Sequence, residues 1–258
     1  MTNIVTETHD SVGIITIARS ERFNSLDPET ARDLRKAGLL FARDAKIRAV
    51  VLRGSNGVFC SGADLKYVRA GEDHGQRFQD VLEYIHSTIS EFRRAAKPFI
   101  AAVDGIAAAG GFGIAMSCDL VLASERAWFE WAYAKTGLTG AESSTFFLPR
   151  LLGLRRAMEM LFLNPRLDAR KALEWGLITA VYPVESFDAE VMTIAKQVAA
   201  LPTEAVGIAK ELMNQAAGMD RLDMHLDREI EHLTRIANGD HFAEGLAAFF
   251  EKRTANFT

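Results

Sequence analysis

The sequence is poor in cysteine and proline and contains no long apolar run. Its 258 residues include 6 prolines and 2 cysteines, Cys60 and Cys118, each within an apolar stretch. This composition argues against the disulfide framework of small secreted domains and predicts a reducing compartment, which we take to be the cytoplasm. No run approaches the roughly 18 apolar residues of a membrane-spanning helix, and the first residues show no signal-peptide pattern, so no membrane span is expected.

Neither sign of charge is in large excess. The 30 basic and 34 acidic side chains leave a formal net charge of -4. A protein that binds nucleic acid usually presents a strongly basic surface, so no nucleic-acid partner is expected. No group of His, Cys, Asp or Glu has the spacing of a metal-ligand set, so no metal site is expected either. The length and the 48% hydrophobic content suffice for a sizeable core.

Short apolar runs alternate with amphipathic segments over the first 200 residues, a pattern typical of an α/β architecture with crossover connections. Asp27 followed by Pro28 is a strong helix-start signal. After Pro202 the pattern is entirely helical. We therefore predict an α/β core over residues 1–200 and a helical region over 201–258. The expected strands are 12–18, 47–52, 99–103, 120–123, 127–129 and 177–181, and the expected helices are 28–43, 81–95, 168–175, 203–218, 221–238 and 240–254.

The most informative stretch is residues 99–124, which read FIAAVDGIAAAGGFGIAMSCDLVLAS. A buried strand is expected first, followed by a run of little but glycine and alanine. Because Gly110 and Gly111 have no side chain, backbone and ligand can approach closely there. A helix beginning near Gly111 would direct unpaired N–H groups at that point, which favours an anion or an oxygen that becomes anionic during a reaction.

Four segments together, 19–26 (RSERFNSL), 58–65 (VFCSGADL), 99–124 and 249–253 (FFEKR), resemble the crotonase (enoyl-CoA hydratase/isomerase) superfamily almost from end to end. The resemblance implies a ββα spiral core with a C-terminal helical oligomerisation region, in a homotrimer or a dimer of trimers. It also implies an acyl-CoA thioester substrate, with coenzyme A carried by the substrate and no separate cofactor. By motif position, the N–H groups of Ala63 and Gly110 would hold the thioester oxygen as it becomes an enolate.

The two glutamates that typical hydratases of this family use are missing. The resemblance places them at Gly113 and Tyr133, and neither residue is a carboxylate. Many isomerase-like members carry an aspartate at the position of Ala141, whereas here Glu142 stands one residue later. A shift of one residue at a helix start redirects a side chain by roughly 100°, so Glu142 could reach the acyl group only if the loop backbone differs.

Glu142 is nevertheless the best acid/base candidate, because an isomerase needs only one carboxylate to remove a proton from one carbon and return it to another. The alternative is a first-turn glutamate that interacts with a helix dipole. Glu130 is the next candidate, and only one of Glu130 and Trp131 can face a pocket if both lie on a strand.

Tyr133 and His86 are further candidates. Tyr133 could donate a hydrogen bond, act as an acid or shape an aromatic pocket. By motif position, His86 and Tyr133 match the catalytic His and the active-site Trp of the 4-chlorobenzoyl-CoA dehalogenase branch. The nucleophilic Asp of that branch falls on Ala141, so covalent aryl transfer is not expected, although His86 could activate water. A packed or surface histidine is the plainer interpretation.

Four cations stand beside the matching motifs and are candidates for the phosphates of coenzyme A: Arg19, Arg22, Lys66 and Lys252. Each could equally be an ordinary surface charge. The resemblance has Lys252 reach coenzyme A from a C-terminal segment, and perhaps from a neighbouring subunit. Residues 66–79 are charged and contain glycine, so they are expected to form either a solvated loop or a mobile lid.

Double-bond isomerisation with Glu142 as the acid/base is the leading prediction. The first alternative is a hydratase or acyl-CoA hydrolase that uses a non-standard base, His86 or Tyr133. The second is a non-catalytic member that binds CoA esters. A serine hydrolase based on Ser143 or Ser144 is disfavoured because the sequence has no Gly-x-Ser-x-Gly elbow.

Overall fold

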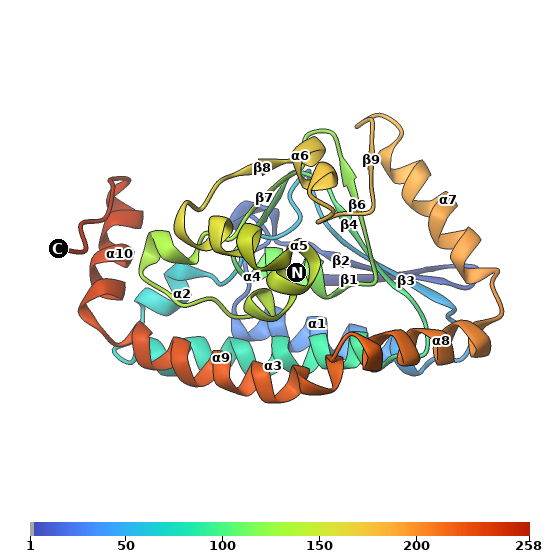
Figure 1. Cartoon of the computed structure of the whole chain (residues 1–258), viewed down its shortest axis with the longest axis horizontal. Helices are drawn as coiled ribbons and strands as arrows, with labels where there is room; N and C mark the ends of the chain where they lie inside the picture. The colour runs from blue at the N-terminus through green and yellow to red at the C-terminus, as the bar shows by residue number, and fades with distance from the viewer. Residues whose placement is uncertain (1–2) are drawn as a thin grey trace.

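The computed structural model describes residues 3–258, which form two sheets covered by helices (Figure 1). The larger sheet has the strand order β1-β2-β3-β4-β6-β9, and the smaller has the order β5-β7-β8. The strands are β1 (Ile4–His9), β2 (Val12–Ile17), β3 (Ala49–Gly54), β4 (Phe99–Val103), β5 (Ile106–Ala108), β6 (Leu120–Ser124), β7 (Trp128–Glu130), β8 (Leu167–Asp168) and β9 (Ala180–Tyr182).

The large sheet is parallel except for its first pair. Strands β1 and β2 are antiparallel, and from β2 onward each neighbour is parallel, with Val50 opposite Phe99 between β3 and β4. Side chains alternate between the two faces, so Val50 and Leu52 enter the main core while Ala49 and Val51 pack on the opposite face. This burial on both faces explains why the strands are continuous apolar runs.

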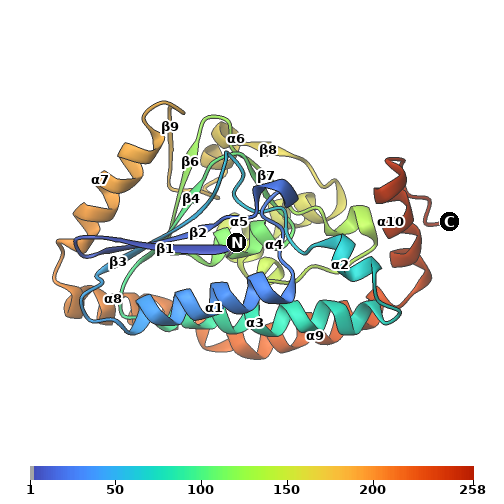
Figure 2. The same ribbon diagram turned by 180° about the vertical axis from the view of Figure 1, so that it is seen from behind.

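Helices form a layer along one long side of the molecule and a single cover on the opposite face of the sheet. Helices α1, α3 and α9 run side by side in this layer, and α7 stands against the other face (Figures 1 and 2). The longer helices are α1 (Pro28–Arg43), α3 (His74–Arg94), α4 (Gly110–Ser117), α5 (Ser144–Phe162), α7 (Phe187–Ala199), α8 (Thr203–Ala216), α9 (Leu222–Ala237) and α10 (Asp240–Glu251). The short ones are α2 (Leu65–Arg69), α6 (Ala169–Glu174), η1 (Ser20–Arg22), η2 (Tyr133–Thr136) and η3 (Met219–Arg221).

The predicted α/β fold is confirmed, and so are its main helix signals. Asp27 accepts a hydrogen bond from the Thr30 N–H at 2.9 Å and caps α1, with Pro28 in the first turn. Of the two interpretations of residues 66–79, the solvated loop is wrong, because α2 occupies residues 65–69 and α3 begins at His74 after an Asp73 cap. The mobile lid stays a prediction. Hydrophobic spacing alone places the start of α3 seven residues too late, because its first four residues, 74–77, carry no apolar side chain.

The smaller sheet sets the position of the glycine- and alanine-rich stretch that includes Gly110 and Gly111. Strand β5 pairs with β7, and a bridge joins Cys60 to Ala107, so residues 60–63 run alongside the start of the glycine run. Ala109 adopts φ 47° and ψ −119° and links β5 directly to α4. No helix within residues 3–258 is long and apolar enough to cross a membrane, and the same residues contain no His, Cys, Asp or Glu cluster that could hold a metal ion.

Candidate active site

Two backbone N–H groups meet at the start of α4. Gly110 is the first residue of this helix, so its N–H has no intrahelical acceptor. Within residues 3–258, neither the Gly110 N–H nor the Ala63 N–H donates a hydrogen bond. The two segments touch, because a β-carbon on Gly62 would lie only 2.9 Å from the Gly110 nitrogen. Ala63 and Gly110 both line the same cavity, as expected for a pair of oxyanion donors.

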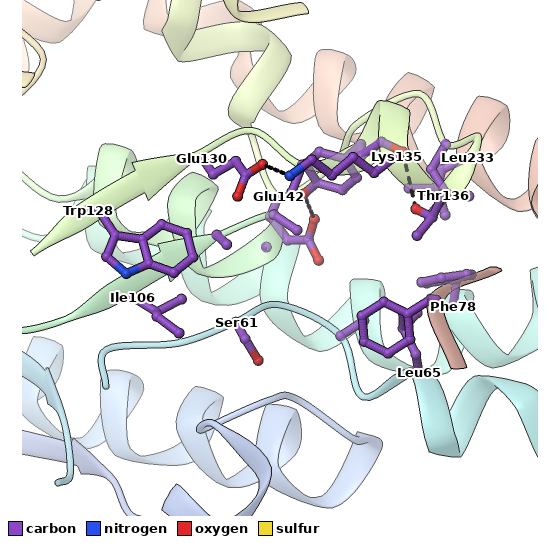
Figure 3. Close-up of a pocket in the computed structure, with 18 residues that line it drawn as sticks. Ser61, Leu65, Phe78, Ile106, Trp128, Glu130, Lys135, Thr136, Glu142 and Leu233 are labelled. Carbon is purple, nitrogen blue, oxygen red and sulfur yellow. Dashed lines mark hydrogen bonds and ion pairs between the residues drawn. The ribbon is translucent and has the colours of Figure 1, made fainter. Parts of the chain in front are cut away.

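This cavity has a volume of about 270 Å³ and is lined mostly by apolar side chains (Figure 3). Trp128, Ile106, Leu65, Phe78 and Leu233 surround it, and Glu142 points into it between them. Its walls come from strands β5 and β7, helices α2, α3, α4, α9, α10 and η2, and the loops before α2 and α5. An apolar cavity with few polar groups is the usual form of a site for an acyl chain or ring.

Glu142 reaches the cavity because the loop backbone before α5 is unusual. Glu142 has φ 48° and the next residue, Ser143, has φ 64°. Two consecutive non-glycine residues in the left-handed region cost on the order of 1 kcal/mol each, so the surrounding structure must impose them. This turn compensates for the one-residue displacement noted in the sequence and directs the carboxyl group at Gly110. The sequence-predicted candidate therefore lies in the site.

Burial and neighbouring groups set the protonation of Glu142. The side chain is buried, and burial raises the pKa of its carboxyl to about 8. The Tyr133 hydroxyl donates a hydrogen bond to Glu142 Oε2, which opposes that rise, and the charge of Glu229 adds to it. Burial and the same carboxyl raise the pKa of Tyr133 well above its ordinary value, so Tyr133 stays protonated and acts as a donor.

His86 does not line this cavity in the described structure. It lies on α3, and its Nε2 accepts the backbone N–H of Glu142 at 3.1 Å. Because Nε2 acts as an acceptor, the imidazole is neutral, and burial lowers its pKa to about 3. His86 is therefore placed to hold the loop that carries Glu142, on the side away from the acyl cavity.

Glu229 is the residue of this cluster that the sequence reasoning missed. Its carboxylate reaches from α9 and accepts the N–H of Ser143 at 2.8 Å and the N–H of Thr145 at 3.1 Å. Burial raises its pKa to about 7. A signal was present in the sequence, since Glu229 occupies an apolar-stripe position between Leu226 and Leu233, where a carboxylate needs a partner.

Glu130 also lines the cavity but is already paired. Its carboxylate forms an ion pair with Lys135, lies 3.6 Å from the Arg166 guanidinium, and accepts the Asn164 side-chain N–H at 2.9 Å. Figure 3 shows the Glu130–Lys135 ion pair among the residues that line the cavity. Trp131 follows the end of β7 and does not line this cavity within the described residues, so only Glu130 of the two faces it. A carboxylate held by these partners is a poor base.

A second cavity of about 430 Å³ continues from the first. Arg22 and Lys66 are among its lining residues, so two of the four predicted cations lie along the same groove. Arg19 is placed differently, because its guanidinium is paired with Asp27 at 2.9 Å and with Asp64 at 2.8 Å. The residues common to both cavities are Ser61, Ala63, Leu65, Ile106 and Phe249.

Lys252 lies outside both cavities in the part of the chain that is described, at the exposed end of α10. Its neighbours Phe249 and Phe250 do line the groove. Ser143 and Ser144 are fully buried beside α5 and do not open into the cavity, so they offer no exposed nucleophile within residues 3–258.

The arrangement suits proton transfer at a carbon next to a carbonyl group. A carbonyl oxygen held by the N–H groups of Ala63 and Gly110 would place its neighbouring carbon close to the Glu142 carboxyl. Such donors stabilise the developing oxyanion by about 3 kcal/mol each. The carboxyl can then remove and return a proton in a water-poor cavity.

Comparison with known proteins agrees with this geometry. The family model described as enoyl-CoA hydratase/isomerase matches residues 7–258. The chain is 33% identical to 4-chlorobenzoyl coenzyme A dehalogenase-2 of Arthrobacter sp, over 97% of this chain and 91% of the relative. It is 32% identical to 1,2-epoxyphenylacetyl-CoA isomerase of Escherichia coli (strain K12), over 99% and 98%. A crystal structure of an enoyl-CoA hydratase from Mycobacterium avium subsp. paratuberculosis K-10 superposes with a TM-score of 0.91 at 32% identity, covering 99% and 98%.

Proposed function

Because the chain belongs to the enoyl-CoA hydratase/isomerase family, we propose that it acts on acyl-CoA thioesters by way of an enolate and moves a carbon–carbon double bond. The observation that carries this proposal is the position of Glu142. Its carboxyl is the one acidic group, among the described residues lining the cavity, that is both free of a cationic partner and adjacent to an oxyanion donor. The relatives carry names of three different reactions, so the reaction must be argued from the site.

The reaction begins when the thioester oxygen of a 3-enoyl-CoA accepts hydrogen bonds from Ala63 and Gly110. The Glu142 carboxylate removes a proton from C2, and the electron pair moves into the conjugated dienolate. The protonated carboxyl then returns a proton to C4, the double bond moves to C2–C3, and the carboxylate is regenerated. Tyr133 holds the carboxyl in place through its hydroxyl group. The phosphates of coenzyme A extend along the second cavity toward Arg22 and Lys66.

The alternatives are weakened by where their residues lie. A hydratase or hydrolase based on His86 would need that imidazole in the cavity, yet His86 accepts a backbone N–H behind the loop. One based on Tyr133 would need a hydroxyl that is not already donating to Glu142. Hydration with Glu142 itself as the base, and binding of CoA esters without conversion, are outcomes that the experiment below distinguishes.

The test is mass spectrometry of 2-enoyl-, 3-enoyl- and aryl-CoA esters after incubation with the protein in heavy water. The proposal predicts a shifted double bond and carbon-bound deuterium without net addition of water. Net addition of water would show that the protein is a hydratase instead, and release of free coenzyme A would show that it is a hydrolase. Binding of the esters without conversion would show that it is a binding protein. Glu142→Gln should abolish the conversion and retain ester binding, whereas the exposed control Glu185→Gln should behave as the wild type.

We also propose that the protein works in the cytoplasm as a homotrimer or a dimer of trimers. The exposed part of α5 carries several large apolar side chains, among them Leu154 at 64% and Phe162 at 76% exposure. Several large exposed apolar side chains on one helix are typical of a surface that packs against another chain. Light scattering coupled to size exclusion should give three or six times the 28.4 kDa chain mass. A monomeric mass would contradict the assembly without affecting the proposed chemistry.

A further inference from the structure

We infer that Glu229 is a positioning residue that makes Glu142 the acid/base, by holding the backbone turn that directs Glu142 into the cavity. The inference rests on the proposed role of Glu142. Glu229 lies on α9 and does not line the acyl cavity in the described structure, so it acts without touching the substrate.

The first argument is the set of contacts. Glu229 Oε2 accepts the N–H of Ser143, and Oε1 accepts both the N–H and the hydroxyl of Thr145. These donors belong to the residue that follows Glu142 and to the first turn of α5. At this helix N-terminus Ser143 provides no side-chain cap, so the carboxylate of Glu229 takes the place of one.

The second argument is the backbone conformation. Glu142 and Ser143 both adopt positive φ, and each of their N–H groups is held by a buried side chain. His86 Nε2 accepts from Glu142, and Glu229 Oε2 accepts from Ser143. Two neighbouring helices, α3 and α9, therefore hold consecutive N–H groups of the turn. Without the Glu229 clamp, the turn can relax toward negative φ, which rotates the Glu142 side chain away from Gly110.

The third argument is the free-energy cost of burying a carboxylate at position 229. Glu229 is 5% exposed and lies on the buried apolar face of α9. A leucine could pack at this position without the free-energy cost of removing a carboxylate from water. No Lys or Arg pairs with it among the described residues. Its nearest titratable neighbours are His86 and His225, each 3.7 Å away, and its charge also acts on Glu142 and Tyr133. Packing of α9 does not explain an acidic side chain at this position, whereas the two backbone N–H groups before α5 do.

The experiment compares Glu229→Gln, Glu229→Ala and the exposed control Glu231→Gln on the same helix. It measures kcat and KM across pH, binding of a non-reactive acyl-CoA analogue, and melting temperature. Removing both acceptors in Glu229→Ala should lower kcat about 100-fold. Glu229→Gln keeps one acceptor and should lower it about 10-fold. Analogue binding should change less than 3-fold in both, and Glu231→Gln should match the wild type.

The pH profile separates positioning from general stabilisation. Glu142 faces Tyr133, Cys60 and Glu229, and its backbone contacts neutral His86. Removal of the Glu229 charge should move the inflection of kcat/KM to lower pH. Wild-type kcat and profile in Glu229→Gln and Glu229→Ala would overturn the inference, and so would a loss of melting temperature and active fraction with an unmoved inflection. The proposed function is tested independently of Glu229, because activity retained by Glu142→Gln would contradict the proposed function whatever the Glu229 variants show.

Discussion

The carboxyl group of Glu142 lies against the backbone of Gly110, where a β-carbon would come within 2.6 Å of Oε1. The proposed proton acceptor and one of the two proposed oxyanion donors are thus adjacent in a buried, apolar cavity. Because the medium is poor in water, both the hydrogen bonds to an enolate and the burial cost of the carboxylate are larger than in solvent. In the proposed reaction, the site therefore combines strong oxyanion stabilisation with a carboxyl that is mostly neutral at pH 7.

The first prediction concerns the pH dependence of catalysis. Since burial raises the pKa of Glu142 to about 8, only a minor fraction of the free enzyme carries the required carboxylate at pH 7. The value of kcat/KM for a 3-enoyl-CoA should therefore rise about tenfold per pH unit below this inflection and level off above pH 8. Initial rates from pH 6 to 9 measure this. A flat profile, or one that falls as the pH rises, would be incompatible with Glu142 as the base.

The second prediction concerns the Tyr133 hydroxyl. In Tyr133→Phe the carboxyl loses the donor that lowers its pKa, so the inflection should move above pH 8. Activity at pH 7 should fall roughly tenfold and recover partly at pH 9. Tyr182→Phe on β9 is the control and should leave the profile unchanged. An equal loss at every pH would instead indicate that Tyr133 transfers a proton itself.

The third prediction concerns the position that holds a glutamate in typical hydratases. A β-carbon on Gly113 would overlap the carbonyl oxygen of Glu142, so the turn before α5 fills the space that a side chain would need. Gly113→Ala should lower the free energy of unfolding by about 1–3 kcal/mol and reduce turnover. Gly113→Glu should not create hydratase activity. Gly239→Ala, where the nearest atom is 3.3 Å away, is the control for denaturant unfolding. Full stability of Gly113→Ala would contradict the predicted overlap.

The sequence predicts those parts of this site whose position is determined by neighbouring residues in the chain. The proposed oxyanion donors Ala63 and Gly110 follow from motifs, and both residues line the same cavity. The orientation of Glu142 does not follow from spacing, because it depends on two positive φ values imposed by α3 and α9. Tertiary contacts of this kind leave no periodic pattern in the sequence.

The distinction between local sequence features and tertiary contacts also explains which helices and strands are predicted correctly. The apolar runs of β3 and β4 and the Asp27 cap of α1 are local features and are predicted well. Strand β1 has five exposed residues out of six, so it shows little buried character, and it forms by pairing with β2. The expected strand at 177–181 appears as β9 three residues later, where pairing with β6 sets the register.

The fourth prediction concerns stability and pH. Burial raises the pKa of Glu142 from 4.5 to about 8 and that of Glu229 to about 7, so the folded state keeps protons that the unfolded chain loses. Stability should therefore fall as the pH rises, by about 2 kcal/mol from Glu142 between pH 6.5 and 8.5. Starting at pH 6.5 keeps the opposing effect of His86 small, because its lowered pKa destabilises the folded state mainly in more acidic solution.

Denaturant unfolding at pH 6.5 and 8.5 measures this fall, and Glu142→Gln should remove most of it. The amide keeps a carbonyl oxygen that can accept the Tyr133 hydrogen bond but has no proton to lose in this range. Glu185→Gln should leave the fall unchanged. Equal slopes for Glu142→Gln and the wild type would show that the Glu142 carboxyl does not hold its proton in the folded state at neutral pH.

The last prediction concerns the groove that continues from the acyl cavity. Arg22 and Lys66 line it without forming an ion pair between residues 3 and 258, so both cations are available to phosphate groups. Lys66→Glu should raise KM for an acyl-CoA about 3- to 10-fold with little change in kcat, because the charge acts on the part of the substrate far from the reacting carbons. The effect should shrink at high salt.

Lys46→Glu is the matched control, since it makes the same change in net charge at an exposed position that lines neither cavity within the described chain. It should leave KM unchanged. A substrate lacking the nucleotide phosphates, such as an acyl-pantetheine, should lose the difference between Lys66→Glu and the wild type. If the Lys66→Glu defect persisted with that substrate, Lys66 would be acting on the loop that carries Ala63, and the groove would not be the phosphate-binding side of the site.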